Sequence, residues 1–286
     1  MKREAYLERD TKYEIMLTKD TAICIRALDY SETSQIATFF ARETGKISAI
    51  AKGSKRPKSY GPIEVFSYGK IVVSVPAGEK LATLTEFDQQ SNFSALAGNL
   101  FVLHCASFAA ELVNLLTNDY DPNPQLFDSF LQFLQNINES QLTSHEPLRR
   151  TPNGGVTSHE LSSLILFQLS LLKEIGLQPI LNACANCKTR HERRDKFTLS
   201  EVEGSDEFYF SSCANGLICR DCEASFPDKI GLSNSAADCL GNLKLLVDAD
   251  EKTLDEVEKI LVHHFTEILH RPPKMAKYIL QSQTGF

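Results

Sequence analysis

The sequence lacks the signatures of several large enzyme classes. None of the patterns HExxH, GxSxG, GxxxxGK[ST] or GxGxxG occurs in its 286 residues. These patterns mark metalloproteases, serine hydrolases, P-loop nucleotidases and dinucleotide-binding enzymes, each because its spacing aims reactive groups at one point. We therefore expect no enzyme.

Long apolar runs and an apolar leader are also missing. The first residues, MKREAYLERD, are highly charged, and no apolar run approaches the roughly 20 residues that span a bilayer. We expect no secretory signal, no membrane contact and a cytoplasmic location. In a reducing compartment the eight cysteines should be thiols or metal ligands, not disulfides.

Acidic residues are missing from one stretch of a chain whose net charge is −7. Residues 1–86 have a charge balance of +3, whereas residues 87–286 have −10. The stretch 45–63 contains no acidic residue and five basic ones, Lys46, Lys52, Lys55, Arg56 and Lys58. Its Gly/Ser/Pro loop would let the backbone approach a polyanion while the cations replace counterions. A solvated basic hairpin without a ligand is the alternative.

Turn residues divide the front of the chain into short β-like segments. The pair Thr44-Gly45 has the character of a tight turn, and Gly69 should bend the strand in which it lies. No helical period is visible before residue 90. Five strands are expected, at 22–28, 35–40, 46–52, 63–75 and 81–87. Such a series predicts a small closed barrel of OB type, placed at residues 1–88.

Beyond residue 90 the apolar residues recur at intervals of three and four, which indicates helices. One long helix is expected from Phe93 to Val113, and others after Pro124, after Thr157 and after Thr253. The last two begin with capping-box spacing, Thr157 to Glu160 and Thr253 to Glu256. The fold class is therefore α+β, with a barrel followed by a helical domain at residues 89–286 that contains an insertion at 180–225.

Two CxxC knuckles define that insertion. They are Cys184 with Cys187 and Cys219 with Cys222, separated by 31 residues. Such spacing aims four thiolates at one ion and leaves zinc no open position, so we expect one structural Zn²⁺ on a ribbon-like hairpin that includes strands at 197–199 and 208–210. Two unrelated pairs of buried or redox cysteines are the alternative. Cys213 could also replace one of the four ligands, and His191 is a weaker substitute.

These features together resemble the RecO family of bacterial recombination mediators. The resemblance rests on the run Thr44-Gly45-Lys46 through Lys52-Gly53-Ser54-Lys55-Arg56-Pro57-Lys58-Ser59. It also rests on the paired knuckles in a helical body, with Phe210-Ser211 ahead of Asn215-Gly216-Leu217-Ile218-Cys219. Where the family pattern has a glycine pair before the third knuckle cysteine, this chain has Asn215-Gly216.

The resemblance implies a role in recombinational DNA repair. It implies an OB barrel that binds single- and double-stranded DNA without sequence preference, with Lys46, Lys52, Lys55, Arg56 and Lys58 as DNA contacts. It further implies strand annealing, and loading of RecA onto single strands coated with single-strand-binding protein (SSB), together with RecR. The SSB C-terminal tail is an implied partner of the helical domain, and the implied location is the nucleoid.

Two other functions remain open from the residues alone. An acidic adaptor that binds only proteins would use the zinc ribbon and helices as a docking surface and leave the basic loop without a ligand. An RNA-binding OB protein would use the same loop, because recognition of the 2′-hydroxyl depends on geometry that a sequence does not display.

Overall fold

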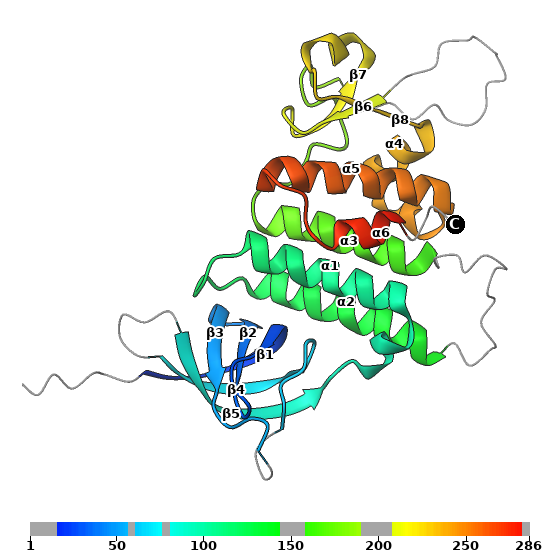
Figure 1. Ribbon diagram of the computed structural model, residues 1–286. Helices are drawn as coiled ribbons and strands as arrows, with labels where there is room; N and C mark the ends of the chain where they lie inside the picture. Colours follow the sequence, from blue (N-terminus) through cyan, green and yellow to red (C-terminus); the bar gives the residue numbers. More distant parts are fainter. Residues whose placement is uncertain (1–15, 57–60, 76–80, 144–157, 190–207, 282–286) are drawn as a thin grey trace, which may run out of the picture. The chain divides into compact units, whose positions relative to one another are not determined.

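The computed structural model describes residues 16–56, 61–75, 81–143, 158–189 and 208–281 (Figure 1). The chain divides into two compact units. The first, called the barrel unit below, comprises residues 1–92 and 118–122; the second, called the helical unit, comprises 93–117 and 123–286. The boundary of 88/89 expected from the sequence stays a prediction.

Five strands close into a barrel in the first unit, as predicted. They are β1 (Met16–Asp29), β2 (Gln35–Ala41), β3 (Gly45–Ala51), β4 (Tyr68–Val75) and β5 (Leu81–Ser91), in the spatial order β1-β2-β3-β5-β4. All neighbours are antiparallel except β3 and β5, which are parallel. The long β1 pairs with both β2 and β4 and so closes the barrel. This is the five-stranded architecture of an OB fold.

The inside of this barrel is lined by buried side chains. In β3 every second residue is buried, so Ile47, Ala49 and Ala51 point inward. The rings of Phe39 and Phe87 belong to the same core cluster, with their centroids 5.9 Å apart. Because apolar residues line the whole interior, the barrel has a complete hydrophobic core of its own.

The fourth strand starts later than expected, at Tyr68 instead of Ile63. Phe66 has φ +70°, a left-handed conformation that a strand does not permit. Its N–H donates to Cys24 O, and Cys24 N–H donates to Ser67 O, at the point where β1 itself is bulged. The predicted irregularity at Gly69 is confirmed by a register shift between Tyr68 and Gly69.

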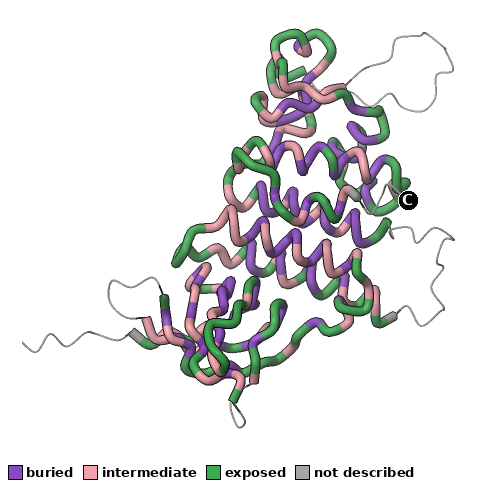
Figure 2. Tube along the Cα trace, viewed as in Figure 1, coloured by how far each residue is buried: buried purple, intermediate pink, exposed green. Residues whose placement is uncertain are grey.

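Six α-helices are described in the helical unit (Figure 1). Within the described residues none is both long and apolar enough to cross a membrane. The central helix α3 contacts α1, α2 and α5 and is buried over most of its length, as the purple segments of Figure 2 show. The helices are α1 (Leu100–Leu116), α2 (Pro124–Thr143), α3 (Ser158–Glu174), α4 (Asn234–Gly241), α5 (Glu251–Leu269) and α6 (Ala276–Gln281).

Two helix starts differ from the prediction. The expected helix from Phe93 is interrupted, because Asn99 adopts an extended conformation and accepts a hydrogen bond from Phe101 N–H at 3.0 Å. A short 3-10 helix, η1 (Ser94–Gly98), therefore precedes α1. Helix α5 is capped by Asp250, whose Oδ1 accepts from Thr253 N–H at 2.8 Å, so Thr253 is not the cap. In both places an Asn or Asp side chain begins the helix, as these residues favour. Thr157, the first residue of the other capping box, lies outside the described residues, and α3 ends shortly before Gly176, which has φ +78°.

A buried polar pair joins α3 to α5. Gln168 Nε2 donates to Glu258 Oε1 at 2.8 Å, and neither residue is accessible to solvent. Burial raises the pKa of Glu258 to about 7. Gln168 Oε1 and Glu258 Oε2 have no partner when the acid is taken as ionised. A charge on a buried carboxylate with an unpartnered oxygen is costly, which favours the protonated acid.

Candidate functional site

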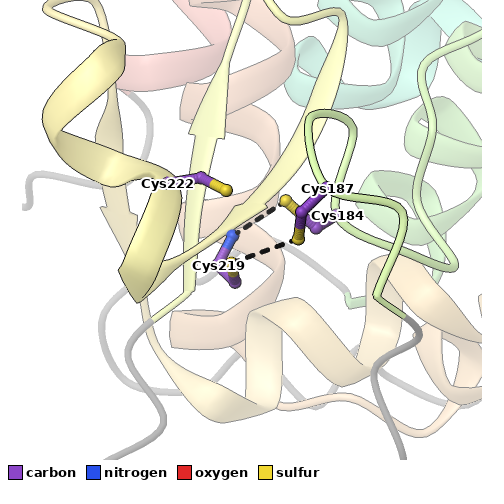
Figure 3. Close-up of side chains that lie close together, drawn as sticks. All are labelled: Cys184, Cys187, Cys219 and Cys222. Atoms are coloured by element: carbon purple, nitrogen blue, oxygen red, sulfur yellow. Dashed lines mark hydrogen bonds between the residues drawn. The ribbon is translucent and has the colours of Figure 1, made fainter.

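The four predicted knuckle cysteines converge on one point in the helical unit. Cys184 and Cys187 lie in a turn, Cys219 ends the strand β7 (Gly216–Cys219), and Cys222 lies in the 3-10 helix η2 (Arg220–Ser225). Their sulfur atoms all lie within 4.8 Å of one another (Figure 3). Among the residues that the structure describes, this is the one group of three or more His, Cys, Asp or Glu side chains placed to hold a metal ion.

A small sheet brings the two knuckles together. Strand β6 (Phe208–Ser211) pairs with β7 and with β8 (Ile230–Leu232). Ile180, just before the first knuckle, joins the other edge of β7: its N–H donates to Asn215 O and its carbonyl accepts from Leu217 N–H, each at 2.9 Å. The expected strand at 208–210 is confirmed, and the one at 197–199 lies outside the described residues.

The pair Asn215-Gly216 explains how the two segments approach so closely. A Cβ atom on Gly216 would lie 2.3 Å from Ile180 O, so only glycine fits. Asn215 has φ +52°, a left-handed conformation that asparagine tolerates better than most residues, and its Nδ2 donates to Gln178 O at 3.2 Å. Asparagine therefore fits at the position where a glycine was expected.

The surroundings of the sulfurs favour bound thiolates. Cys219 N–H donates to Cys184 Sγ at 3.4 Å, and Asn186 Nδ2 donates to Cys222 Sγ at 3.3 Å. The hydroxyl of Thr189 lowers the pKa of Cys187 to about 6, whereas burial raises the pKa of Cys219 to about 12. Sulfurs this close cannot all ionise alone, because each negative charge raises the cost of the next. A divalent cation removes that cost, so the donor set fits a metal ion.

The remaining cysteines do not belong to this cluster. Cys213, the open alternative ligand, is exposed, and its N–H donates to Asp228 Oδ2 at 2.9 Å. The charge of Asp228 raises the pKa of the Cys213 thiol, which disfavours a thiolate there. Cys24, Cys105 and Cys239 are buried. His191 lies outside the described residues.

In the barrel unit, the basic loop follows the end of β3. Gly53 has φ +69°, and its N–H donates to Ser34 Oγ at 3.1 Å, which turns the chain back toward the turn between β1 and β2. One side chain fixes both flanks of the loop: Gln35 Oε1 accepts from Ser54 Oγ at 3.1 Å and from Ile63 N–H at 2.8 Å. Ser54 and Gln35 are buried beneath the loop, whereas Lys52 and Arg56 are exposed.

The predicted cations fall into three groups. Lys52 and Arg56 are exposed. Lys55 Nζ forms an ion pair with Asp29 Oδ1 at 2.5 Å, and Lys46 Nζ lies 3.5 Å from Asp119 Oδ1. Lys58 lies outside the described residues.

The two carboxylates were missed by the sequence analysis. Asp119 lies in the segment 118–122, which belongs to the barrel unit although it follows α1 in the chain. Its neighbour Tyr120 donates its N–H to Lys46 O at 3.0 Å, and a Cβ on Gly45 would lie 2.3 Å from Asp121 O. Lys46 is thus drawn into a packed junction, where its side chain is only 12% exposed.

Comparison with protein families covers nearly the whole described chain. The model described as "Recombination protein O N terminal" matches residues 16–93. The model described as "Recombination protein O C terminal" matches residues 97–151 and 153–276. The first match contains the barrel strands and the basic loop, and the second contains the helices and the four-cysteine cluster.

Curated relatives agree with the family models. The DNA repair protein RecO of Bacillus pumilus is 29% identical over 278 residues, which cover 94% of this chain and 96% of the relative. Those of Bacillus subtilis and of Bacillus cereus strain B4264 are 29% and 32% identical, over 88% and 66% of this chain and 89% and 68% of the relatives. Both family models match in order and together span the barrel, the helices and the cysteine cluster, so the chain belongs to the RecO family of recombination and DNA repair proteins.

Proposed function

We propose that this protein binds DNA through the basic loop without reading its sequence, and anneals complementary strands during recombinational repair. The observation that carries the proposal is the position of Lys52 and Arg56, exposed on a loop that Gln35 fixes to an OB-type barrel. Cations held in this way contact phosphates, which carry no sequence information. Annealing needs such tolerance, because any two complementary strands must be accepted.

The ion pairs of Lys55 and Lys46 indicate which of the five cations are available to contact phosphates. Lys52 and Arg56 are proposed as the primary contacts, joined by Lys58 from the same loop. Lys55 must exchange Asp29 for a phosphate, which costs little because both partners are partly exposed and such pairs contribute about 0–1 kcal/mol. Lys46 is the least available of the five, since it is largely buried beside Asp119.

A salt titration tests the electrostatic part. For a single strand the slope of log K against log salt is about −0.7 per neutralised phosphate, so five cations predict about −3.5 and Lys52 with Arg56 alone about −1.4. The affinity of a fluorescent thymidine oligonucleotide would be measured by anisotropy over a range of salt concentrations. A slope near zero would contradict the proposal.

Competition separates DNA binding from the two other functions. The labelled DNA strand would be displaced at fixed salt by unlabelled DNA or by RNA of the same base sequence. Preferential displacement by RNA would indicate an RNA-binding protein, and absence of any binding would indicate a protein adaptor. Tighter binding of DNA, or equal binding of both, is expected from a surface that contacts only phosphates.

We further propose that the metal is one structural Zn²⁺. Zinc–sulfur bonds of about 2.3 Å in a tetrahedron place the sulfurs about 3.8 Å apart. Cys187 Sγ and Cys219 Sγ are already 3.7 Å apart. Four thiolates leave no position for a water molecule, so the ion would hold the knuckles together and take no part in a reaction. We therefore assign the protein no enzymatic role.

The partners follow from family membership and stay part of the proposal. We propose that the protein acts with RecR and with SSB, through the SSB C-terminal tail, so that RecA replaces SSB on single strands. This work would take place on DNA in the bacterial cytoplasm. Mixing SSB-coated complementary strands that carry a fluorescence donor and acceptor would measure annealing directly, and adding RecR and RecA would show whether RecA filaments then form.

A further inference from the structure

The turn between β1 and β2 is joined to the basic loop at three points. Lys55 N–H donates to Thr33 O at 3.2 Å, and Gly53 N–H donates to Ser34 Oγ at 3.1 Å. The third point is the ion pair between Lys55 and Asp29. The turn and the loop therefore form one surface.

Tyr30 lies in this turn, directly after Asp29. Its backbone is held because its N–H donates to Ser34 O at 3.0 Å. The residue nevertheless remains 64% exposed. A fixed backbone that presents an aromatic ring to solvent, beside cations suited to phosphates, has the two parts of a single-strand binding surface.

We propose that Tyr30 stacks on an unpaired base of the bound strand and so gives the protein a preference for single strands over duplex. This inference rests on the proposed function, since it needs a strand on the basic loop. An aromatic ring stacks on any base, which keeps binding sequence-tolerant. A paired base inside a duplex has no free face to offer. When two strands anneal, the base stacked on Tyr30 is taken up by its complement, which weakens the hold on the duplex product.

Stacking contributes about 1–3 kcal/mol per base when measured by alanine substitution, or roughly 5- to 150-fold in affinity. Tyr30→Ala should therefore weaken binding of a thymidine oligonucleotide by that factor. Binding of an abasic strand of equal length should be unchanged, because it offers phosphates without bases. Duplex binding should also be unchanged, and Tyr30→Phe should behave like the wild type.

The absence of tryptophan from the chain allows a direct optical test. Tyr30→Trp introduces a single tryptophan, whose fluorescence should be quenched when a base stacks on it. Leu17→Trp is the matched control, because Leu17 is 63% exposed near the other end of β1. Quenching by the thymidine strand but not by the abasic strand is expected for Tyr30→Trp, and none for Leu17→Trp.

Three results would overturn the inference. The first is equal affinity of Tyr30→Ala and wild type for the thymidine strand, and the second is an equal loss of affinity for the thymidine and abasic strands. Neither of these two results contradicts the proposed function, provided that binding of the strand still depends on Lys52 and Arg56. The third is a wild-type protein that binds no strand at all, which removes the proposed function together with the inference. Thermal unfolding of each full-length variant verifies that its fold is intact.

Discussion

The barrel unit and the helical unit present their functional groups in opposite ways. In the barrel unit a closed apolar core supports the loop, and Lys52 and Arg56 are exposed above it. In the helical unit the knuckles rest on three strands of four, four and three residues, and their own hydrophobic cluster has only Cys184, Ile218 and Cys222 as buried members. A region with so small a core depends on another source of stability. The barrel should therefore fold without its ligand, and the cysteine region should require one.

The largest expected effect concerns the knuckles. Structural zinc in small sites contributes on the order of 10–16 kcal/mol of apparent binding free energy, as much as the whole stability of a domain. Cys184→Ser or Cys222→Ser should therefore lose the metal and unfold the region around it. Elemental analysis would measure the metal, and amide hydrogen exchange with mass spectrometry should show faster exchange at residues 178–189 and 208–232 but not at residues 16–56.

Cys213→Ser is the matched control, because this exposed cysteine lies between the knuckles but outside the cluster. It should retain the metal and the wild-type exchange pattern. A metal-free Cys184→Ser protein with wild-type hydrogen exchange around the knuckles would show that the cysteine region, like the barrel, folds without a ligand.

A double charge reversal tests the barrel side of the comparison. Lys52→Glu combined with Arg56→Glu removes two charge-assisted contacts of about 1.5 kcal/mol or more each, so single-strand affinity should fall at least about 100-fold. The midpoint of thermal unfolding should change little, since both side chains are exposed. Anisotropy and calorimetry would measure the two quantities on the same protein.

Lys244→Glu combined with Lys252→Glu makes the same change in net charge at exposed positions of the helical unit. Under the proposal this variant binds nearly as tightly as the wild type. Equal losses in the two double variants would mean that the charge of the whole chain, and not the loop, governs binding.

The buried acid in the helical unit provides a pH test. The pKa of Glu258 is raised from 4.5 to about 7, so the folded state holds this proton more tightly than the unfolded chain. Its stabilising contribution is complete below pH 4.5 and is lost as the pH rises through 7, a change of roughly 3 kcal/mol. Glu258→Gln keeps a donor for Gln168 and does not titrate. Its unfolding free energy minus that of the wild type should therefore increase over this range.

Because the difference between the two unfolding free energies is taken, the contributions of titrating groups that behave alike in both proteins cancel. These include His264, whose pKa burial lowers to about 4. Urea unfolding at a series of pH values gives the free energies. A constant difference between Glu258→Gln and the wild type over this range would refute the assignment of the proton.

The smallest expected effect concerns the ion pair between Lys55 and Asp29 on the barrel unit. Asp29→Asn releases Lys55 from its ion pair, which should raise single-strand affinity by about 2- to 5-fold and steepen the salt slope by about 0.7. Glu32→Gln removes an equal charge from an exposed position in the same turn. If both substitutions act alike, the effect is general repulsion and the ion pair has no part in it.

The sequence predicted those elements whose position is set by residues close together in the chain. Strands β2 and β3 follow from the short β-like segments on either side of the turn at Thr44-Gly45, and each observed bound differs from the predicted one by at most one residue. The cysteine cluster follows from two-residue spacing within each knuckle. The start of β4 did not follow, because the left-handed Phe66 is set by hydrogen bonds to a bulge in β1.

The site itself was predictable only in part. Asp29 and Asp119 lie 26 and 73 residues from the lysines that they contact, and only closure of the barrel and packing of segment 118–122 bring them together. Tyr30 is one of eight tyrosines, and nothing in its neighbourhood in the sequence distinguishes it from the others. The spacing in the sequence therefore identified functional residues that lie close together along the chain. Contacts between residues that are far apart in the sequence could be found only from the structure.

The side chain of Gln35 has a consequence for protein engineering. Its amide holds Ser54 on one side of the loop and both backbone groups of Ile63 on the other, so the entry and exit points are set by the barrel. The residues between these points can therefore be treated as a replaceable cassette. A change in the length of the loop between Ser54 and Ile63 should leave these two end points in place as long as the contacts of Gln35 are kept.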